Sequence, residues 1–136
     1  MARGIVKGGL NDGGSLILTA GDNYFAGNTV ISATTSSSYA KTKEVSINAS
    51  GTIRVKFDMR TNSTTAYGRI YKNGVAVGVI RQTSSASYIT YTEDIAVVAG
   101  DLIQIYAMTA SGTTYITNLK LYTGIVFIGT TFSVDV

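Results

Sequence analysis

The sequence predicts an all-β fold, an antiparallel β-sandwich of jelly-roll type with a glycine-rich N-terminal arm. Apolar and polar residues alternate over residues 53–59, which places one face of a strand in a core and the other in water. Asn73-Gly74 lies between two such runs and indicates a tight hairpin, because both turn positions need φ > 0. Strand-like segments recur about every 8–12 residues with turn residues between them, which is typical of sandwiches and barrels.

Length and composition predict a single sandwich domain preceded by a short arm. The chain has 136 residues, of which 45% are hydrophobic and 14% charged, and no stretch shows the apolar spacing of a helix. Residues 1–28 are glycine-rich, so we expect an arm that packs on the body or on a partner, and we assign residues 29–136 to the sandwich. A plain edge strand at residues 15–19 is the alternative for part of this arm.

Alternation and turn residues place the strands and their inward faces. We expect Ile53, Val55, Phe57, Leu119 and Leu121 to be buried together. In the segment 39–47, Val45 and Ile47 should point inward, and Lys41, Lys43 and Glu44 should lie near the surface. No internal repeat stands out. The expected strands cover residues 29–33, 39–47, 51–61, 66–71, 75–80, 88–97, 102–108 and 114–122.

Residues 39–122, about three-fifths of the chain, resemble a jelly-roll-like β-sandwich domain of virion proteins from bacteriophages of Gram-positive bacteria. The resemblance implies a structural or attachment module without catalytic residues. Because it covers most of the chain, we expect a small capsid-bound accessory protein rather than a tail fibre. The segments that carry the resemblance are KEVSINASGTIRVKFD at 43–58, AYGRIYKNGVAVG at 66–78, YTEDI at 91–95 and AGDLIQIYA at 99–107.

The residue types argue against enzymatic chemistry and against a bound cofactor. The chain has no His and no Cys, so the usual general base, thiolate nucleophile and commonest metal ligands are missing. Glu93 and Asp94 are adjacent, so on a strand they point to opposite faces and cannot act as an acid–base pair. Asp58 should pair with the basic residues around it on the strand. We therefore predict a non-enzymatic protein with no metal and no cofactor.

Charge and hydropathy limit the partners. The net charge of +3 and pI of about 9.2 are a mild basic excess, and the basic residues are scattered, so we expect no nucleic-acid partner. No apolar run is long enough to span a membrane, and the first residues lack a secretion signal. We expect a virion protein that is made in the host cytoplasm.

Two partner surfaces follow from these considerations. For a capsid decoration protein, the contacts to the major capsid protein should come from Arg3, Lys7 and Leu10 of the arm, and the protein should form a homo-oligomer, most simply a trimer, with part of the apolar tail 125–136 buried between subunits. The alternative is an attachment module for a host-surface carbohydrate, with Tyr67, Arg69 and Tyr71 as glycan contacts. Tyr88 and Tyr115 are weaker candidates for the same role.

Overall fold

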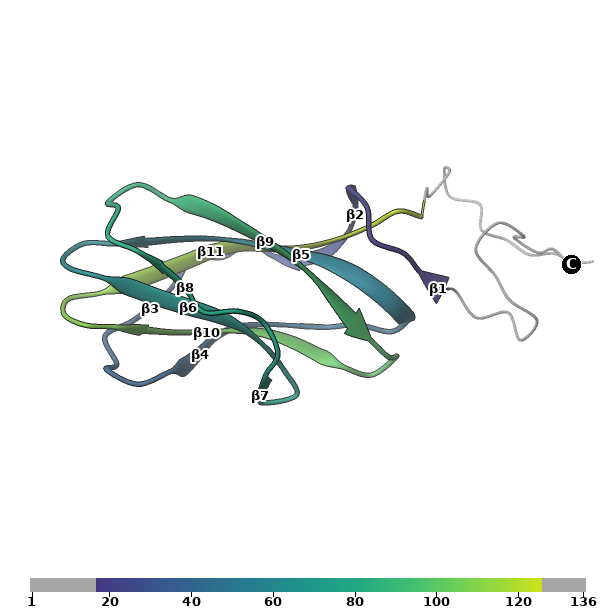
Figure 1. Cartoon of the computed structure of the whole chain (residues 1–136), viewed down its shortest axis with the longest axis horizontal. Coiled ribbons are helices and arrows are strands. Elements are labelled where there is room, and N and C mark those ends of the chain that lie inside the picture. The colour runs from purple at the N-terminus through teal and green to yellow at the C-terminus, as the bar shows by residue number, and fades with distance from the viewer. Residues whose placement is uncertain (1–16, 126–136) are drawn as a thin grey trace, which may run out of the picture.

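A computed structural model describes residues 17–125, and these residues form an all-β structure. The strands run lengthwise and loops join them at both ends of the molecule (Figure 1). The strands are β1 (Ile17–Leu18), β2 (Asn23–Asn28), β3 (Ser32–Thr34), β4 (Ala40–Ser46), β5 (Ser50–Thr61), β6 (Ala66–Lys72), β7 (Val75–Ala76), β8 (Arg81–Thr83), β9 (Ile89–Val97), β10 (Leu102–Thr109) and β11 (Thr114–Thr123).

Two sheets pack face to face, which confirms the predicted all-β sandwich. The 6-stranded sheet has the order β1-β5-β11-β2, with β3 also paired to β11 and β9 to β5. The 5-stranded sheet has the order β4-β10-β6-β7, with β8 also paired to β6. We call these the first and the second sheet. The jelly-roll detail and the glycine-rich arm stay predictions.

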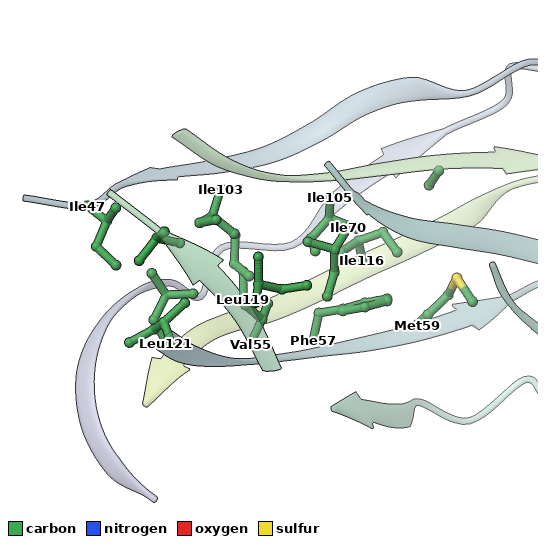
Figure 2. Close-up of a cluster of buried hydrophobic side chains, with 14 of the residues drawn as sticks. Ile47, Val55, Phe57, Met59, Ile70, Ile103, Ile105, Ile116, Leu119 and Leu121 are labelled. Carbon is green, nitrogen blue, oxygen red and sulfur yellow. The ribbon is translucent and has the colours of Figure 1, made fainter. Parts of the chain in front are cut away.

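The longest strand, β5, supplies the centre of the core, as its alternation predicts. Ile53, Val55, Phe57 and Met59 are at most 1% exposed, and the residues between them lie on the outer face. Leu119 and Leu121 of β11 are fully buried beside them, so the predicted core cluster is confirmed. Figure 2 shows these side chains meeting those of the second sheet, Ile70, Ile103 and Ile105.

Part of the predicted N-terminal arm belongs to the sandwich. β1 pairs in parallel with the start of β5, and Leu18 is buried in the core. β2 pairs with β11 in antiparallel orientation. For Ile17 and Leu18 the structure thus has the edge strand that was the alternative to an arm. Residues 1–16 and 126–136 lie outside the described part.

The Asn73-Gly74 hairpin is present, but its return strand is shorter than predicted. Asn73 and Gly74 have φ values of 53° and 82°, and Lys72 pairs directly with Val75 across the turn. The predicted strand over residues 75–80 is wrong after Ala76. Regular pairing stops there because the amides of Val77 and Gly78 both donate to the carbonyl of Ile70, and pairing with β6 resumes only at β8.

Lys43 was expected near the surface, and this expectation is wrong. Lys43 alternates in phase with Val45 and Ile47 and lies opposite the inward-facing Ile105, so its side chain points into the sandwich. Lys43 is 2% exposed, its Nζ donates to Asn28 Oδ1 at 3.0 Å, and burial lowers its pKa.

The two sheets are related by an internal two-fold pseudosymmetry that was not expected from the sequence. The strands β3, β4, β5 and β6 correspond in this order to β8, β9, β10 and β11. When each strand is exchanged with its counterpart, the first-sheet order β3, β11, β5, β9 becomes β8, β6, β10, β4, which is the order of the second sheet. We call each of these two sets of four paired strands one half of the molecule. The registers match as well. Equivalent pairs are Thr114 opposite Thr34 and Thr61 in one half, and Ala66 opposite Thr83 and Thr109 in the other.

The loops at one end of the sandwich repeat the same local structure. Thr34 Oγ1 accepts a hydrogen bond from the amide of Ser36, and Thr83 Oγ1 accepts one from the amide of Ser85. A threonine side chain that caps the second residue after it forms a tight turn. These matched turns hold equivalent strands in equivalent positions, so each half can be compared with the other residue by residue.

Candidate functional site

The predicted glycan contacts lie together on the outer face of the second sheet. Tyr67, Arg69 and Tyr71 alternate on β6 with the buried residues Ala66 and Ile70. Each of the three is partly buried. The structure therefore brings the predicted residues onto one surface, as the alternation of β6 indicates.

Two of the three side chains on this face, Tyr71 and Arg69, already contact other parts of the protein. The ring of Tyr71 stacks on Tyr106 with a centroid distance of 3.8 Å and an interplanar angle of 9°. Tyr39 approaches the same ring at 6.2 Å. Arg69 Nε donates to the carbonyl of Gly78 at 2.6 Å. A sugar ring stacks on an open aromatic face, and one face of Tyr71 is occupied by Tyr106.

Tyr39 and Tyr106 complete this cluster, and sequence reasoning missed both. Burial raises the pKa of Tyr39, and its hydroxyl is buried without a hydrogen-bond partner among residues 17–125. Tyr106 lies opposite Arg69 across the β10–β6 pair. Alternation along β10 would place Tyr106 on the outer face, but only the strand order puts it beside β6.

The outer face of the first sheet carries a group of paired charges around Arg54. Arg54 Nε pairs with Asp94 at 2.9 Å, and Arg54 Nη1 pairs with Asp22 at 3.1 Å. The hydrogen bond that Arg54 donates to Asp94 is the main reason that the pKa of Arg54 is raised, and the hydrogen bond that Arg54 donates to Asp22 is the main reason that the pKa of the Asp22 carboxyl is lowered. Lys56 lies 3.6 Å from Asp22 and 4.8 Å from the ring centroid of Tyr122.

Asp58 was expected to pair with these basic residues, and this expectation is wrong for the part of the chain that the structure describes. Its carboxylate accepts hydrogen bonds from Thr90 Oγ1 at 2.6 Å and from Asn118 Nδ2 at 2.9 Å. Asn118 reaches Asp58 because β11 has a register shift against β5 at this point, where Asn118 takes a left-handed φ of 52°. Nothing in the sequence alone indicates that bulge.

Arg60 of β5 lies between Tyr115 of β11 and Tyr88, which directly precedes β9. Its Cζ is 4.0 Å from the ring centroid of Tyr115 and 5.3 Å from that of Tyr88. Tyr115 is directly opposite Arg60 in the β11–β5 register. With the described residues, the Arg60 side chain makes no hydrogen bond or ion pair. The two weaker glycan candidates from the sequence thus flank one guanidinium.

The two adjacent acidic residues that were considered as catalytic groups, Glu93 and Asp94, both make structural contacts. Asp94 faces out to Arg54, whereas Glu93 accepts hydrogen bonds from the amide of Val79 and from Arg81, so the two adjacent carboxylates do lie on opposite faces. Within residues 17–125 there is no group of three or more acidic residues placed to hold a metal ion. The capsid-contact candidates Arg3, Lys7 and Leu10 lie outside the described residues.

Comparison with known proteins gives no family for this chain. A scan against protein-family models and a search of curated proteins both find no match. Among the described residues, no helix is long and apolar enough to cross a membrane. The function is therefore argued from the surface of the sandwich and from the resemblance in the sequence.

Proposed function

We propose that this protein is a non-enzymatic structural protein of a bacteriophage virion. It forms a homotrimer and binds the major capsid protein on the outer surface of the capsid. The resemblance of residues 39–122 to virion sandwich domains supports this proposal. The observation that carries it is a pair of exposed apolar edges on the sandwich.

The two apolar edges occupy equivalent places in the two halves. Val30 and Ile31 directly precede β3 and are 71% and 61% exposed. Val79 and Ile80 directly precede β8 and are 53% and 56% exposed. Glu93 holds the amide of Val79 at 3.2 Å, so the backbone that presents these side chains is anchored. Exposed apolar groups at two equivalent places favour contacts with other protein surfaces.

Two such edges are what a cyclic trimer needs. In a closed ring every subunit contacts two neighbours, and it uses a different surface for each. The Val30 edge of one subunit would pack against the Val79 edge of the next. Val75 and Val77 extend the second edge and are 64% and 39% exposed, so that edge offers the larger apolar surface.

The trimer is tested by changing one edge. In the double variant Val79→Ser with Ile80→Ser, we expect light scattering to report a monomer where the parent protein is a trimer. Val98→Ser is the matched control, because Val98 is 60% exposed but lies on another loop. A parent protein that is monomeric at micromolar concentration would contradict the proposed assembly.

Capsid binding is tested by co-sedimentation with expanded, undecorated capsids of the phage that encodes the chain. Deleting residues 1–14 removes Arg3, Lys7 and Leu10, and we expect binding to weaken at least about tenfold because the contacts proposed for these residues are lost. Added salt should weaken the full chain more than the truncated one, since the arm contributes the charges. Equal binding by both forms would assign capsid recognition to the sandwich body.

The second candidate function is attachment to a host-surface carbohydrate. The observation in its favour is the tyrosine cluster around Tyr67, Arg69 and Tyr71 on the second sheet. Retention on host cell-wall polysaccharide, together with absence of capsid binding, would favour this function over capsid decoration.

A further inference from the structure

On the outer face of the first sheet, Arg60 and the two tyrosines beside it, Tyr88 and Tyr115, have side-chain donors and acceptors without a partner among residues 17–125. A guanidinium has five N–H donors, and Arg60 directs none of them to an acceptor among residues 17–125. Each oxygen of Asp58 accepts one hydrogen bond and can accept another. The hydroxyls of Tyr88 and Tyr115 likewise have no hydrogen-bond partner in that part of the chain. Donors, acceptors and aromatic rings thus share one small surface.

The other half of the molecule shows that the fold does not need these groups. The positions equivalent to Tyr88, Arg60 and Tyr115 are Tyr39, Met108 and Tyr67, as the matching registers show. Both pairs of tyrosines are kept, while a neutral thioether replaces the cation. A charge at this position is therefore not required to hold the two tyrosines on the sheet.

The bulge at Asn118 is also absent from the other half. β6, the counterpart of β11, pairs with β10 without a register shift. β11 instead breaks its register and places a non-glycine residue at a φ of 52°, which brings the Asn118 amide to Asp58. Bulges and left-handed residues are common where a side chain must be aimed at a ligand.

We propose that Arg60, Asp58, Asn118, Tyr88 and Tyr115 form a binding site for a neutral saccharide. Vicinal hydroxyls of a sugar both donate and accept, so they match a guanidinium beside a hydrogen-bonded carboxylate, and the tyrosines offer apolar contact for the ring. Asp58 lies two residues from Arg60 on β5, and its negative charge disfavours an anionic ligand. This proposal goes beyond the capsid role and does not depend on it.

The site is tested on the purified full-length protein without capsids. Saturation-transfer NMR with glucose, galactose, N-acetylglucosamine, rhamnose and their oligosaccharides should reveal binding of at least one neutral sugar. Sodium phosphate and glucuronate serve as anionic probes. No binding of any neutral sugar, or binding of the anionic probes alone, would overturn the proposal.

Two variants separate the site from the fold. Arg60→Met reproduces the residue of the other half, and Asn118→Gly keeps a residue that adopts positive φ while it removes the amide. Each should weaken sugar binding about tenfold or more while the melting temperature stays close to that of the parent.

Lys41→Met, which removes an exposed cation of the second sheet outside both clusters, is the matched control and should leave sugar binding unchanged. Arg69→Met tests the tyrosine cluster of the second sheet. If sugar binding survives Arg60→Met and Asn118→Gly but is lost in Arg69→Met, recognition belongs to the second sheet and the proposed site is wrong.

Discussion

The outer faces of the two sheets share one framework but use it differently. On the second sheet, tyrosines stack on each other and Arg69 is bound to a backbone carbonyl. On the first sheet, the Arg60 guanidinium donates no hydrogen bond to any of residues 17–125, and a bulge turns Asn118 toward Asp58. Because the strand orders match, the difference lies in side chains and in local register shifts, among them the bulge at Asn118. A repeated architecture thus provides its own control for deciding which surface groups the fold requires.

The inner faces of the two halves differ at one informative position. Phe57 of β5 lies opposite Tyr91 of β9, and their rings are 5.6 Å apart. The equivalent pair in the other half is Ile105 of β10 opposite Lys43 of β4. An aromatic pair in one half therefore corresponds to an aliphatic residue beside a buried lysine in the other. Stability measurements can establish whether the two halves contribute equally to the core.

The largest expected effect is in the core. Phe57→Ala should cost about 3–5 kcal/mol of unfolding free energy, from lost transfer energy and a cavity, because Phe57 is 1% exposed. Ile105→Ala in the other half should cost about 2–5 kcal/mol for the same reason. Urea denaturation measures both. A loss below about 1 kcal/mol for Phe57→Ala would show that β5 is in the wrong phase.

The next largest effect is expected at the Asn73-Gly74 hairpin of the second sheet. Gly74 has a φ of 82° with open space around its Cβ position, so a substitution there meets backbone strain and no clash. Gly74→Val should cost about 1–3 kcal/mol, because a β-branched residue resists positive φ. Gly74→Asn is the control and should cost less, since Asn tolerates this conformation. Equal melting of Gly74→Val and the parent would exclude a primed turn.

Much of the fold could be predicted because the signals are local. The alternation along β5 sets its inner and outer faces, and Asn73-Gly74 sets one hairpin register. Lys43 has the same phase as the inward-facing Val45 and Ile47, but its charge favoured a surface position in the prediction. Asn118 could not be placed, because it depends on a bulge that arises from pairing with a strand far away in sequence. A single shift reverses the facing of the residues that follow it.

The internal pseudosymmetry is visible in the sequence only as one pair of similar short segments. The segments TTSSSY at 34–39 and TSSASY at 83–88 are similar, and both form the capped loops described above. Beyond them the two halves keep spacing and turn positions rather than residue identity. For the site, alternation placed Tyr67, Arg69 and Tyr71 on one face, but the contacts that occupy them depend on β10 and on Gly78.

A smaller effect is expected at the turn before β10. Asp101 is 6% exposed and accepts hydrogen bonds from the amide of Val98 and from Asn73 Nδ2, each at 2.8 Å, which lowers its pKa. A carboxylate with a lowered folded-state pKa stabilises the fold above its unfolded pKa of about 3.9, and this contribution is lost as the pH falls through the folded value.

Asp101→Asn should therefore cost about 1 kcal/mol at pH 7, and the cost should shrink toward pH 3. Urea unfolding at both pH values measures this difference. Asp94→Asn, which changes an exposed ion pair of the first sheet, should have little effect at either pH. A cost for Asp101→Asn that stays constant with pH would mean that the charge of Asp101 is not involved.

The smallest effect tests the inner-face difference directly, at Lys43. This cation is buried with Asn28 Oδ1 as its only hydrogen-bond partner among the described residues, so its charge opposes folding. Its folded-state pKa is lowered by burial. As the pH rises through that value, the folded state releases its proton before the unfolded state does. The parent protein should therefore gain stability toward pH 10 from this group.

Lys43→Met should be neutral or should stabilise the protein by up to about 1 kcal/mol at pH 7, because an apolar side chain then faces Ile105 as Tyr91 faces Phe57. The advantage over the parent should narrow toward pH 10, and comparing variant with parent at each pH cancels the ionisation of the tyrosines. Phe57→Leu is the counterpart control in the other half, where the aromatic contact with Tyr91 is lost and no titratable group is removed, so its cost should show no such narrowing. If Lys43→Met destabilises by several kcal/mol at pH 7, the buried ammonium is a structural requirement of β4, and the two halves differ in what holds their edge strands.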